Sequence, residues 1–441
     1  MLTSLYLENR LRLTGCLNDS GRSETSSQSD GLSVFVKHRT GQGIAATSRV
    51  SATQALSCLK VARLKADKNA PSDQEINDIL TAFNGFRVNS ALGPPLEIAK
   101  FLSQTLNSIA SRLNVLVEDY QIESFIEKKR VQVASSAKKY ELLTDERLYV
   151  GVSVEVLVLD QASKLRCIER SLGVISNDIG TLRKKIWKLF LEVRKAVRKN
   201  SRSVSIYINS RKKENLVLSP QAAGIFFHEV VGHQLEEKNL PSDIKNKIFN
   251  PLLNIWNMPV SKTLFGSFLF DDIGNMAKDT KLVSNGIITG LITDNTISPS
   301  FNNSICLRRQ DYRFPPVQRM SNIYVEPGTK TIKQLIVDCK TGIYIEKCIE
   351  GNFDPVLCDY SIKVTEAYRI KDGRLGASLS PFTIYGNTFS DLQKIGGIGN
   401  KTVDQATFCF GSGVTLPVGM RSPAVLIEGI TIKELDNANQ I

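Results

Sequence analysis

The spacing of apolar residues changes near residue 200, and this change restricts the folds that the chain can adopt. From Val150 to Val158 every second residue is valine, which is the period of a strand with one buried face. Residues 182–199 repeat apolar side chains at helical spacing, and beyond residue 200 short apolar runs alternate with turn residues. We predict an α+β fold with two domains: an N-terminal α+β domain at residues 1–200, ending in a basic amphipathic helix, and a β-rich C-terminal domain at residues 201–441.

Local signals predict further elements in the first 200 residues. Ser72 and Glu75 form a capping box, so a helix is expected to start there. A second helix is expected after the Pro94-Pro95 pair. Residues 22–31 are polar and predict a loop, whereas residues 32–38 alternate apolar and polar side chains as a strand does.

In the second half, the pattern predicts strands joined by tight turns. Asn285-Gly286 and Asp372-Gly373 are dipeptides typical of two-residue hairpin turns. The strands are expected at residues 204–208, 286–290, 343–345, 361–370 and 424–432. One helix interrupts them, with Ser219 as its N-cap and Pro220 in its first turn, and runs from Gln221 to Lys238.

Composition excludes some classes of protein. The chain has no run of about 18 apolar residues, so no membrane-spanning helix is expected. Its eight cysteines show no paired spacing and its first residues do not resemble a secretion signal, which favours reduced thiols in the cytoplasm. Part of the net charge of +12 lies on residues 182–199. Without a repeated basic motif, a solvated helix face is favoured there over a surface for nucleic acid or membranes.

The helix predicted after Ser219 carries the residues of a hydrolytic metal site. The chain has three histidines, and two of them, His228 and His233, flank Glu229 within six residues. Neutral imidazoles bind zinc, and zinc lowers the pKa of water to about 7. A neighbouring carboxylate can then take the proton of that water as a general base. The sequence therefore favours a metal site over two ordinary polar histidines.

The histidine spacing requires an irregular helix. Histidines at i and i+4 lie about 40° apart around an α-helix, but positions i and i+5 lie about 140° apart and do not face one ion. A local π-turn would bring them to the same side. Gly232 is where the backbone can loosen at least steric cost. We therefore predict a distorted or broken helix at residues 230–233.

A third protein ligand is required, because catalytic zinc usually has three protein ligands and one open position. Spacing alone does not choose it. The candidates are Glu236, Glu237, Asp271, Asp272 and the downstream cysteines.

These segments resemble the TldD/PmbA family of metalloproteases. Residues 222–236 are similar to the signature helix of its active members, which carry H-E-x-x-x-H. Other segments match the family in order and spacing: residues 270–274, 282–290, 308–322, 364–368, 399–400 and 416–419. The first half matches more loosely, through residues 31–48 and 150–158.

The resemblance implies a zinc-dependent metallopeptidase that binds one Zn²⁺ per chain and hydrolyses unfolded or small peptides. It places the third ligand at Cys409, beside His228 and His233, and makes Glu229 the general base. Arg319 and Asn322 are then candidates for contact with substrate or with the developing oxyanion, or else members of a buried hydrogen-bond network. For Asp271 and Asp272 a role in shaping a turn is favoured over metal binding.

The family also implies partners. Its members pair as dimers around a cavity, so we expect a homodimer or a heterodimer with a related PmbA/TldE-like subunit. Peptide substrate would be held as an added strand. The alternative to an active peptidase is a non-catalytic subunit that shapes the chamber or recruits a partner. Where many members carry a glycine run, residues 342–351 include bulky Ile349 and Glu350, so we expect a substrate groove of different shape.

Overall fold

The computed structural model describes residues 2–38, 41–67, 69–86, 92–93, 95–113, 117–161, 163, 165–201, 206, 212–293 and 301–434. Within these residues the chain combines helices with strands in the α+β arrangement that the sequence predicts. None of the helices described is both long enough and apolar enough to cross a membrane. The strand expected at residues 204–208 lies outside the described residues, apart from Ile206.

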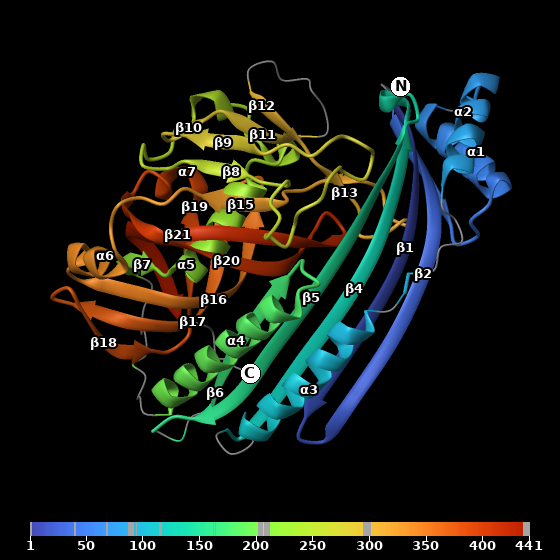
Figure 1. Cartoon of the computed structure of the whole chain (residues 1–441). Helices are drawn as coiled ribbons and strands as arrows, with labels where there is room; N and C mark the ends of the chain where they lie inside the picture. Colours follow the sequence, from blue (N-terminus) through green and yellow to red (C-terminus); the bar gives the residue numbers. More distant parts are fainter. Residues whose placement is uncertain are drawn as a thin grey trace.

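The first half forms a six-stranded antiparallel sheet in the order β3-β2-β1-β4-β5-β6. Its strands are β1 (Leu2–Asn18), β2 (Gly21–His38), β3 (Gly41–Thr47), β4 (Asp119–Ser135), β5 (Leu142–Leu159) and β6 (Leu165–Val174). Its helices are α1 (Ala52–Asp67), α2 (Asp73–Gly85), α3 (Leu96–Leu113) and α4 (Ile179–Asn200). The long, curved strands stand beside the second half of the molecule, and α1 and α2 lie at one end of them (Figure 1).

Alternation along the strands sends side chains to opposite faces of this sheet. The five valines from Val150 to Val158 pack in one core with α3 and α4, so the predicted buried face of β5 is confirmed. In β1, Leu5 and Leu7 pack in the core that contains α1 and α2. Tyr6 points the other way and contacts residues of the second half. The helices therefore cover one face of the sheet, and the second half packs against the other.

One prediction for this sheet was wrong. Residues 22–31 belong to strand β2 instead of a loop, and they pair residue by residue with β1. Side chains 21–29 are exposed, so no apolar alternation marks this stretch as a strand. Its strand conformation comes from the backbone ladder with β1, to which side-chain polarity makes no contribution.

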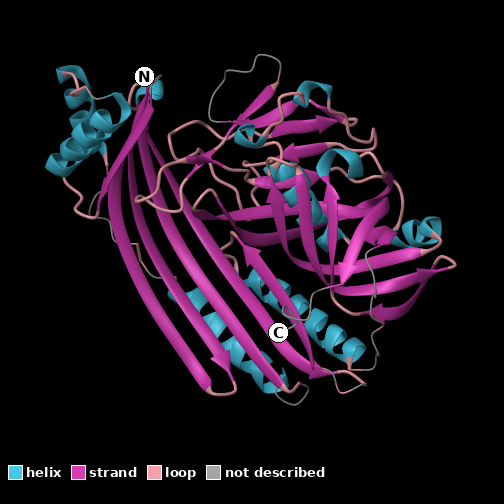
Figure 2. Ribbon diagram, turned by 180° about the vertical axis from the view of Figure 1, so that it is seen from behind, coloured by secondary structure: helices cyan, strands magenta, loops and turns pink. Residues whose placement is uncertain are grey.

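The second half forms an eleven-stranded sheet with short helices and smaller ribbons around it. The sheet contains β7 (Lys212–Leu218), β8 (Ile255–Asn257), β9 (Thr280–Ser284), β10 (Ile287–Ile288), β15 (Asn322–Val325), β16 (Gly342–Asp354), β17 (Asp359–Lys371), β18 (Arg374–Leu379), β19 (Phe382–Asn387), β20 (Ile395–Gly411) and β21 (Val414–Glu434). The remaining elements are α5 (Pro220–Phe227), α6 (Ile332–Cys339), α7 (Thr388–Asp391), β11 (Gly290–Thr293), β12 (Asn302–Ile305), β13 (Leu307–Arg308) and β14 (Val317–Gln318). Figure 2 shows this sheet from behind, packed around α5. Both predicted hairpin turns are present, because Asn285-Gly286 and Asp372-Gly373 have positive φ at both positions.

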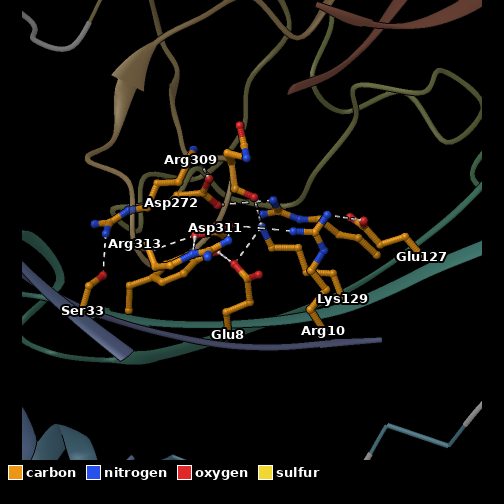
Figure 3. A network of polar contacts seen from close by, with 12 residues as sticks. Glu8, Arg10, Ser33, Glu127, Lys129, Asp272, Arg309, Asp311 and Arg313 are labelled. Atoms are coloured by element: carbon orange, nitrogen blue, oxygen red, sulfur yellow. Dashed lines mark hydrogen bonds and ion pairs between the residues drawn. The ribbon is translucent and has the colours of Figure 1, made fainter. Parts of the chain in front are cut away.

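A buried polar network joins the two halves (Figure 3). Arg309, from the segment after β13, donates a hydrogen bond to Ser33 Oγ of β2 at 2.6 Å, and its guanidinium lies 4.7 Å from the ring centroid of Tyr6. Its backbone N–H donates to Asp272 at 2.7 Å, and Asp272 in turn pairs with Arg147 of β5 at 3.3 Å. These contacts hold the first sheet against the second half, where the candidate site lies.

Candidate metal centre

The helix that carries the two histidines begins as the sequence predicts. Ser219 Oγ accepts a hydrogen bond from the N–H of Ala222 at 3.1 Å, and Pro220 is the first helical residue. After Phe227 the chain passes into a π-helix at His228–His233. The predicted distortion is therefore confirmed. The expected single helix to Lys238 is wrong, because the π-helix ends at His233 and a separate 3₁₀ turn spans Glu237–Asn239.

Gly232 serves a different purpose from the one that the sequence suggested. A Cβ at this position would overlap the Sδ of Met320 and press on Ile323. Its φ is not in the left-handed region. The glycine therefore allows the π-helix to pack closely on the segment before β15, and the wider helical turn does not itself require it.

The π-helix directs both imidazoles at one thiol. His228 Nε2 lies 3.1 Å from Cys409 Sγ, and His233 Nε2 lies 3.3 Å from it. Zinc at about 2.0–2.1 Å from nitrogen and about 2.3 Å from sulfur would place tetrahedral nitrogen and sulfur ligands about 3.5 Å apart. Potential ligand atoms of the three residues lie within 4.8 Å of one another. The three residues can therefore hold one metal ion.

Charges around the thiol favour the form that binds metal. Burial opposes ionisation of Cys409, but the two imidazoles outweigh it and lower the pKa of the thiol to about 4. Arg319 adds a hydrogen bond from its guanidinium to Sγ at 2.7 Å. Burial also opposes protonation of His233, yet Cys409 and Glu236 raise its pKa. A bound cation would replace the proton shared among these groups.

The Glu229 carboxylate lies beside the same centre. Its Oε1 is 4.0 Å from His228 Nε2, and its Oε2 is 3.8 Å from His233 Nε2. Gly351 of β16 lies against it, and a Cβ there would overlap Glu229 Cγ. These residues line a cavity of about 550 Å³ between the π-helix, β16, β20 and β6. A water or a peptide carbonyl in this cavity would have access to both Glu229 and the metal ligands.

Of the two proposed substrate contacts, Arg319 lines the cavity and Asn322 does not. Arg319 is fully buried and links Cys409 to Glu236, whose Oε1 lies 3.3 Å from its Nε. Asn322 uses its side chain elsewhere: its Oδ1 accepts from the N–H of Gly266 at 2.8 Å, and its amide donates to Met258 O at 2.6 Å. Asn322 therefore belongs to a buried hydrogen-bond network.

The other acidic candidates for the third ligand lie around the centre or away from it. Glu236 Oε1 is 3.7 Å from His233 Nδ1, which is the position of a residue that orients a metal ligand. Asp271 accepts from the N–H groups of Ile273 and Asn275, and so shapes a turn. Asp272 lies in the network that joins the halves.

Sequence reasoning missed two residues of the cavity wall, Gly351 and Lys347. Both lie in β16, more than a hundred positions from the π-helix. No local pattern marks them, because only the packing of β16 on the π-helix brings them to the site. The nearest signal was bulky Ile349 and Glu350, which stand where many family members carry a glycine run and predicted a substrate groove of different shape.

Comparison with known proteins identifies the family. Residues 211–434 match the PmbA/TldA metallopeptidase C-terminal domain, which covers half of the 441 residues. The chain belongs to the TldD/PmbA family. The expected relationship is therefore confirmed, and with it membership of a metallopeptidase family.

Individual relatives agree with this assignment. A metalloprotease of Methanothermobacter thermautotrophicus is 29% identical over 231 residues, covering 49% of this chain and 50% of that protein. A zinc metalloprotease TldD homolog of Saccharolobus solfataricus is 28% identical over 229 residues, covering 49% of this chain and 51% of that protein. The chain thus spans about half the length of these curated relatives.

The fold is shared over nearly the whole chain. The crystal structure of TldE from Thermococcus kodakarensis superposes with a TM-score of 0.71 and covers 98% of this chain and 96% of that chain. Sequence identity in this superposition is 13%. Both halves of this TldD/PmbA protein therefore have counterparts in a known structure.

Proposed function

We propose that this chain is a zinc-dependent metallopeptidase that hydrolyses unfolded or small peptides, with Glu229 as general base. The observation that carries the proposal is the convergence of His228, His233 and Cys409 on one point with the Glu229 carboxylate beside it. The relative named zinc metalloprotease TldD homolog supports zinc as the metal.

Each residue of the site has its own role in peptide hydrolysis. The two imidazoles and the Cys409 thiolate would hold the ion, which would supply Lewis acidity toward water and the scissile carbonyl. Glu229 takes a proton from the attacking water and delivers it to the leaving amine. Glu236 holds the ring of His233 in place through Nδ1. Arg319 holds the thiol in position through its hydrogen bond to Sγ.

The compartment and the partner are also part of this proposal. All eight cysteines are free thiols, and Cys409 must stay reduced to bind metal, which favours the reducing cytoplasm. We propose a homodimer or a heterodimer with a related PmbA/TldE-like subunit, because the superposed structure is that of a TldE. The mass of the purified chain in solution, alone and with such a subunit, tests the pairing.

The decisive experiment separates metal binding from hydrolysis. Purified protein is expected to contain about one zinc per chain. Glu229→Ala should keep the zinc and lose cleavage of an unstructured peptide by a factor of at least about 100, since a general base contributes 10²–10⁴-fold. His228→Ala and Cys409→Ala should lose both zinc and cleavage.

Glu118→Ala is the matched control, because Glu118 is an exposed carboxylate outside the cavity. It should change neither property. Full cleavage by Glu229→Ala would exclude the mechanism. A wild-type chain that binds no zinc and cleaves nothing would instead be the non-catalytic subunit.

A further inference from the structure

The wall of the metal cavity opposite the π-helix contains an irregular stretch of β16. Pairing between β16 and β17 shifts register between Ile345 and Lys347, again between Lys347 and Cys348, and again before Glu350. Such bulges change the direction of side chains along a strand. The irregular stretch contributes Lys347 to the lining of the cavity, and Gly351, which lies against Glu229, follows just after it.

The ammonium of Lys347 is a charge in the cavity lining that no described residue pairs with directly. Within the described part of the chain, no hydrogen bond or ion pair reaches its Nζ. The acid directly across the ladder is Glu366, which Arg170 of β6 already holds through two hydrogen bonds of 2.5 and 2.8 Å. Burial, aided by the nearby charge of Arg170, lowers the pKa of Lys347. The ammonium is therefore partly desolvated, and the attraction of the nearby acids does not outweigh this cost.

None of the described acids of the cavity forms a direct ion pair with this ammonium. Glu236 is paired with Lys238 at 3.1 Å and with Arg319 at 3.3 Å. Glu229 lies between the two imidazoles. Glu169 attracts Lys347 electrostatically, but no ion pair joins them among the described residues. The Lys347 ammonium in the cavity wall is thus available to a negatively charged group of a bound ligand.

We propose that Lys347 binds a carboxylate of the peptide substrate, so that the enzyme prefers peptides with an acidic group next to the bond that it cleaves. The proposal rests on the peptidase function proposed above. The carboxylate has two sources in a peptide, the side chain of Asp or Glu and the free C-terminus. Either would form a charge-assisted hydrogen bond with the ammonium at the cavity wall.

A set of matched peptides tests this proposal. One unstructured peptide carries a central Glu and its twin carries Gln, and each is made with a free and with an amidated C-terminus. For the zinc-loaded wild type, kcat/KM for a carboxylate peptide should exceed that for its neutral twin by about 10- to 100-fold, the contribution of a hydrogen bond to a charged group. The Glu/Gln pair and the free/amidated pair show which carboxylate is recognised.

Variants of Lys347 assign the preference to this residue. Lys347→Met should bring the ratio close to one, and Lys347→Arg should restore most of the preference. Lys401→Met removes an exposed lysine of β20 that does not line the cavity, so it should leave the ratio as in the wild type. An unchanged ratio in Lys347→Met overturns the proposal.

A binding measurement keeps this test separate from that of peptidase function. Zinc-loaded Glu229→Gln, and the same protein with Lys347→Met added, are titrated with the four peptides by calorimetry. Tighter binding of carboxylate peptides that is lost with Lys347 supports the proposal, even if the wild type cleaves none of them and the peptidase function fails. Equal binding of all peptides, or no binding, overturns it.

Discussion

At the candidate metal centre, some residues are positioned by the absence of a neighbouring side chain, and others by hydrogen bonds and nearby charges. Gly351 is the clearest case, since the candidate base Glu229 occupies the space that a side chain on β16 would fill. Cys409 shows the complementary effect, because the two facing imidazoles lower the pKa of its buried thiol, and the Arg319 guanidinium donates a hydrogen bond to the sulfur. The site thus combines residues of the π-helix, β16 and β20 with Arg319 from the segment between β14 and β15.

Replacing Gly351 with alanine tests this dependence. The three atoms nearest to the added Cβ all belong to the Glu229 side chain, so the substitution would displace this carboxylate and not the three candidate metal ligands. We expect Gly351→Ala to keep about one zinc and to lose about 10- to 100-fold in kcat/KM, because small misplacements of catalytic groups have effects of this size.

Gly376→Ala is the control for that substitution. Gly376 lies in β18, where an added Cβ would make only ordinary contact with a backbone oxygen. Zinc content by metal analysis and peptide cleavage are measured on both variants. Normal activity in Gly351→Ala would contradict the role given to this contact.

At the level of elements, the π-helix is the unit that makes the site possible. Its wider turn brings histidines five residues apart to one thiol, which a regular α-helix of the same sequence would not do. Residues outside the π-helix hold it in place. Met320 and Ile323 pack on Gly232, and the Glu236 carboxylate accepts a hydrogen bond from the N–H of Met320 at 3.3 Å. Packing therefore selects the irregular helix.

Gly232→Ala should consequently destabilise the protein. The Cβ would overlap Met320 at a fully buried position, and overpacking of this kind costs about 1–3 kcal/mol. Urea unfolding measures the change. Gly85→Ala in α2 is the matched helical control, since a Cβ there would meet Leu142 at an ordinary 3.6 Å, and it should be neutral or stabilising. Equal stability of the two variants would show that the π-helix tolerates the extra volume.

For the whole molecule, the polar network in Figure 3 lies where the first sheet meets the half that carries the candidate metal site. Arg309, from the segment after β13, donates a hydrogen bond to Ser33 of the first sheet. Arg147 of β5 forms an ion pair with Asp272 of the second half. The same packing brings β6 beside β20, where Glu169 and Ser171 complete the cavity wall. The cavity is therefore a product of both halves.

The charge of Asp272 should make this junction sensitive to acid. Burial opposes ionisation, but Arg147 and Lys129 outweigh it and lower the pKa of Asp272 below its ordinary 3.8. A lowered pKa in the folded state adds stability above the unfolded pKa, and this stability is lost as the pH falls through the folded value.

Asp272→Asn should thus be less stable than wild type by about 1–3 kcal/mol near neutral pH. The difference should shrink below about pH 4, where the unfolded carboxyl is protonated. Urea unfolding of both proteins between pH 3 and pH 7 measures it. A difference that is independent of pH would mean that the carboxylate charge does not contribute.

The parts of the fold that depend on near neighbours could be read from the sequence. The valine alternation of β5, the Ser72 and Ser219 caps and the positive-φ turns each involve residues within a few positions of one another. The candidate ligands could also be named, since H-E-x-x-x-H is a local pattern and Cys409 follows from the family resemblance. Even the irregular helix was predictable, because two histidines at i and i+5 reach one ion only if the turn widens.

Only the tertiary structure decided what depends on residues far apart in the chain. The polar stretch of β2 is a strand because its backbone pairs with β1, and Asn322 is structural because three distant groups use its amide. Gly351 and Lys347 belong to the site because β16 packs on the π-helix. Periodicity and capping are short-range effects of the backbone, whereas the position of a side chain in a cavity is set by close packing between elements, which a linear pattern does not encode.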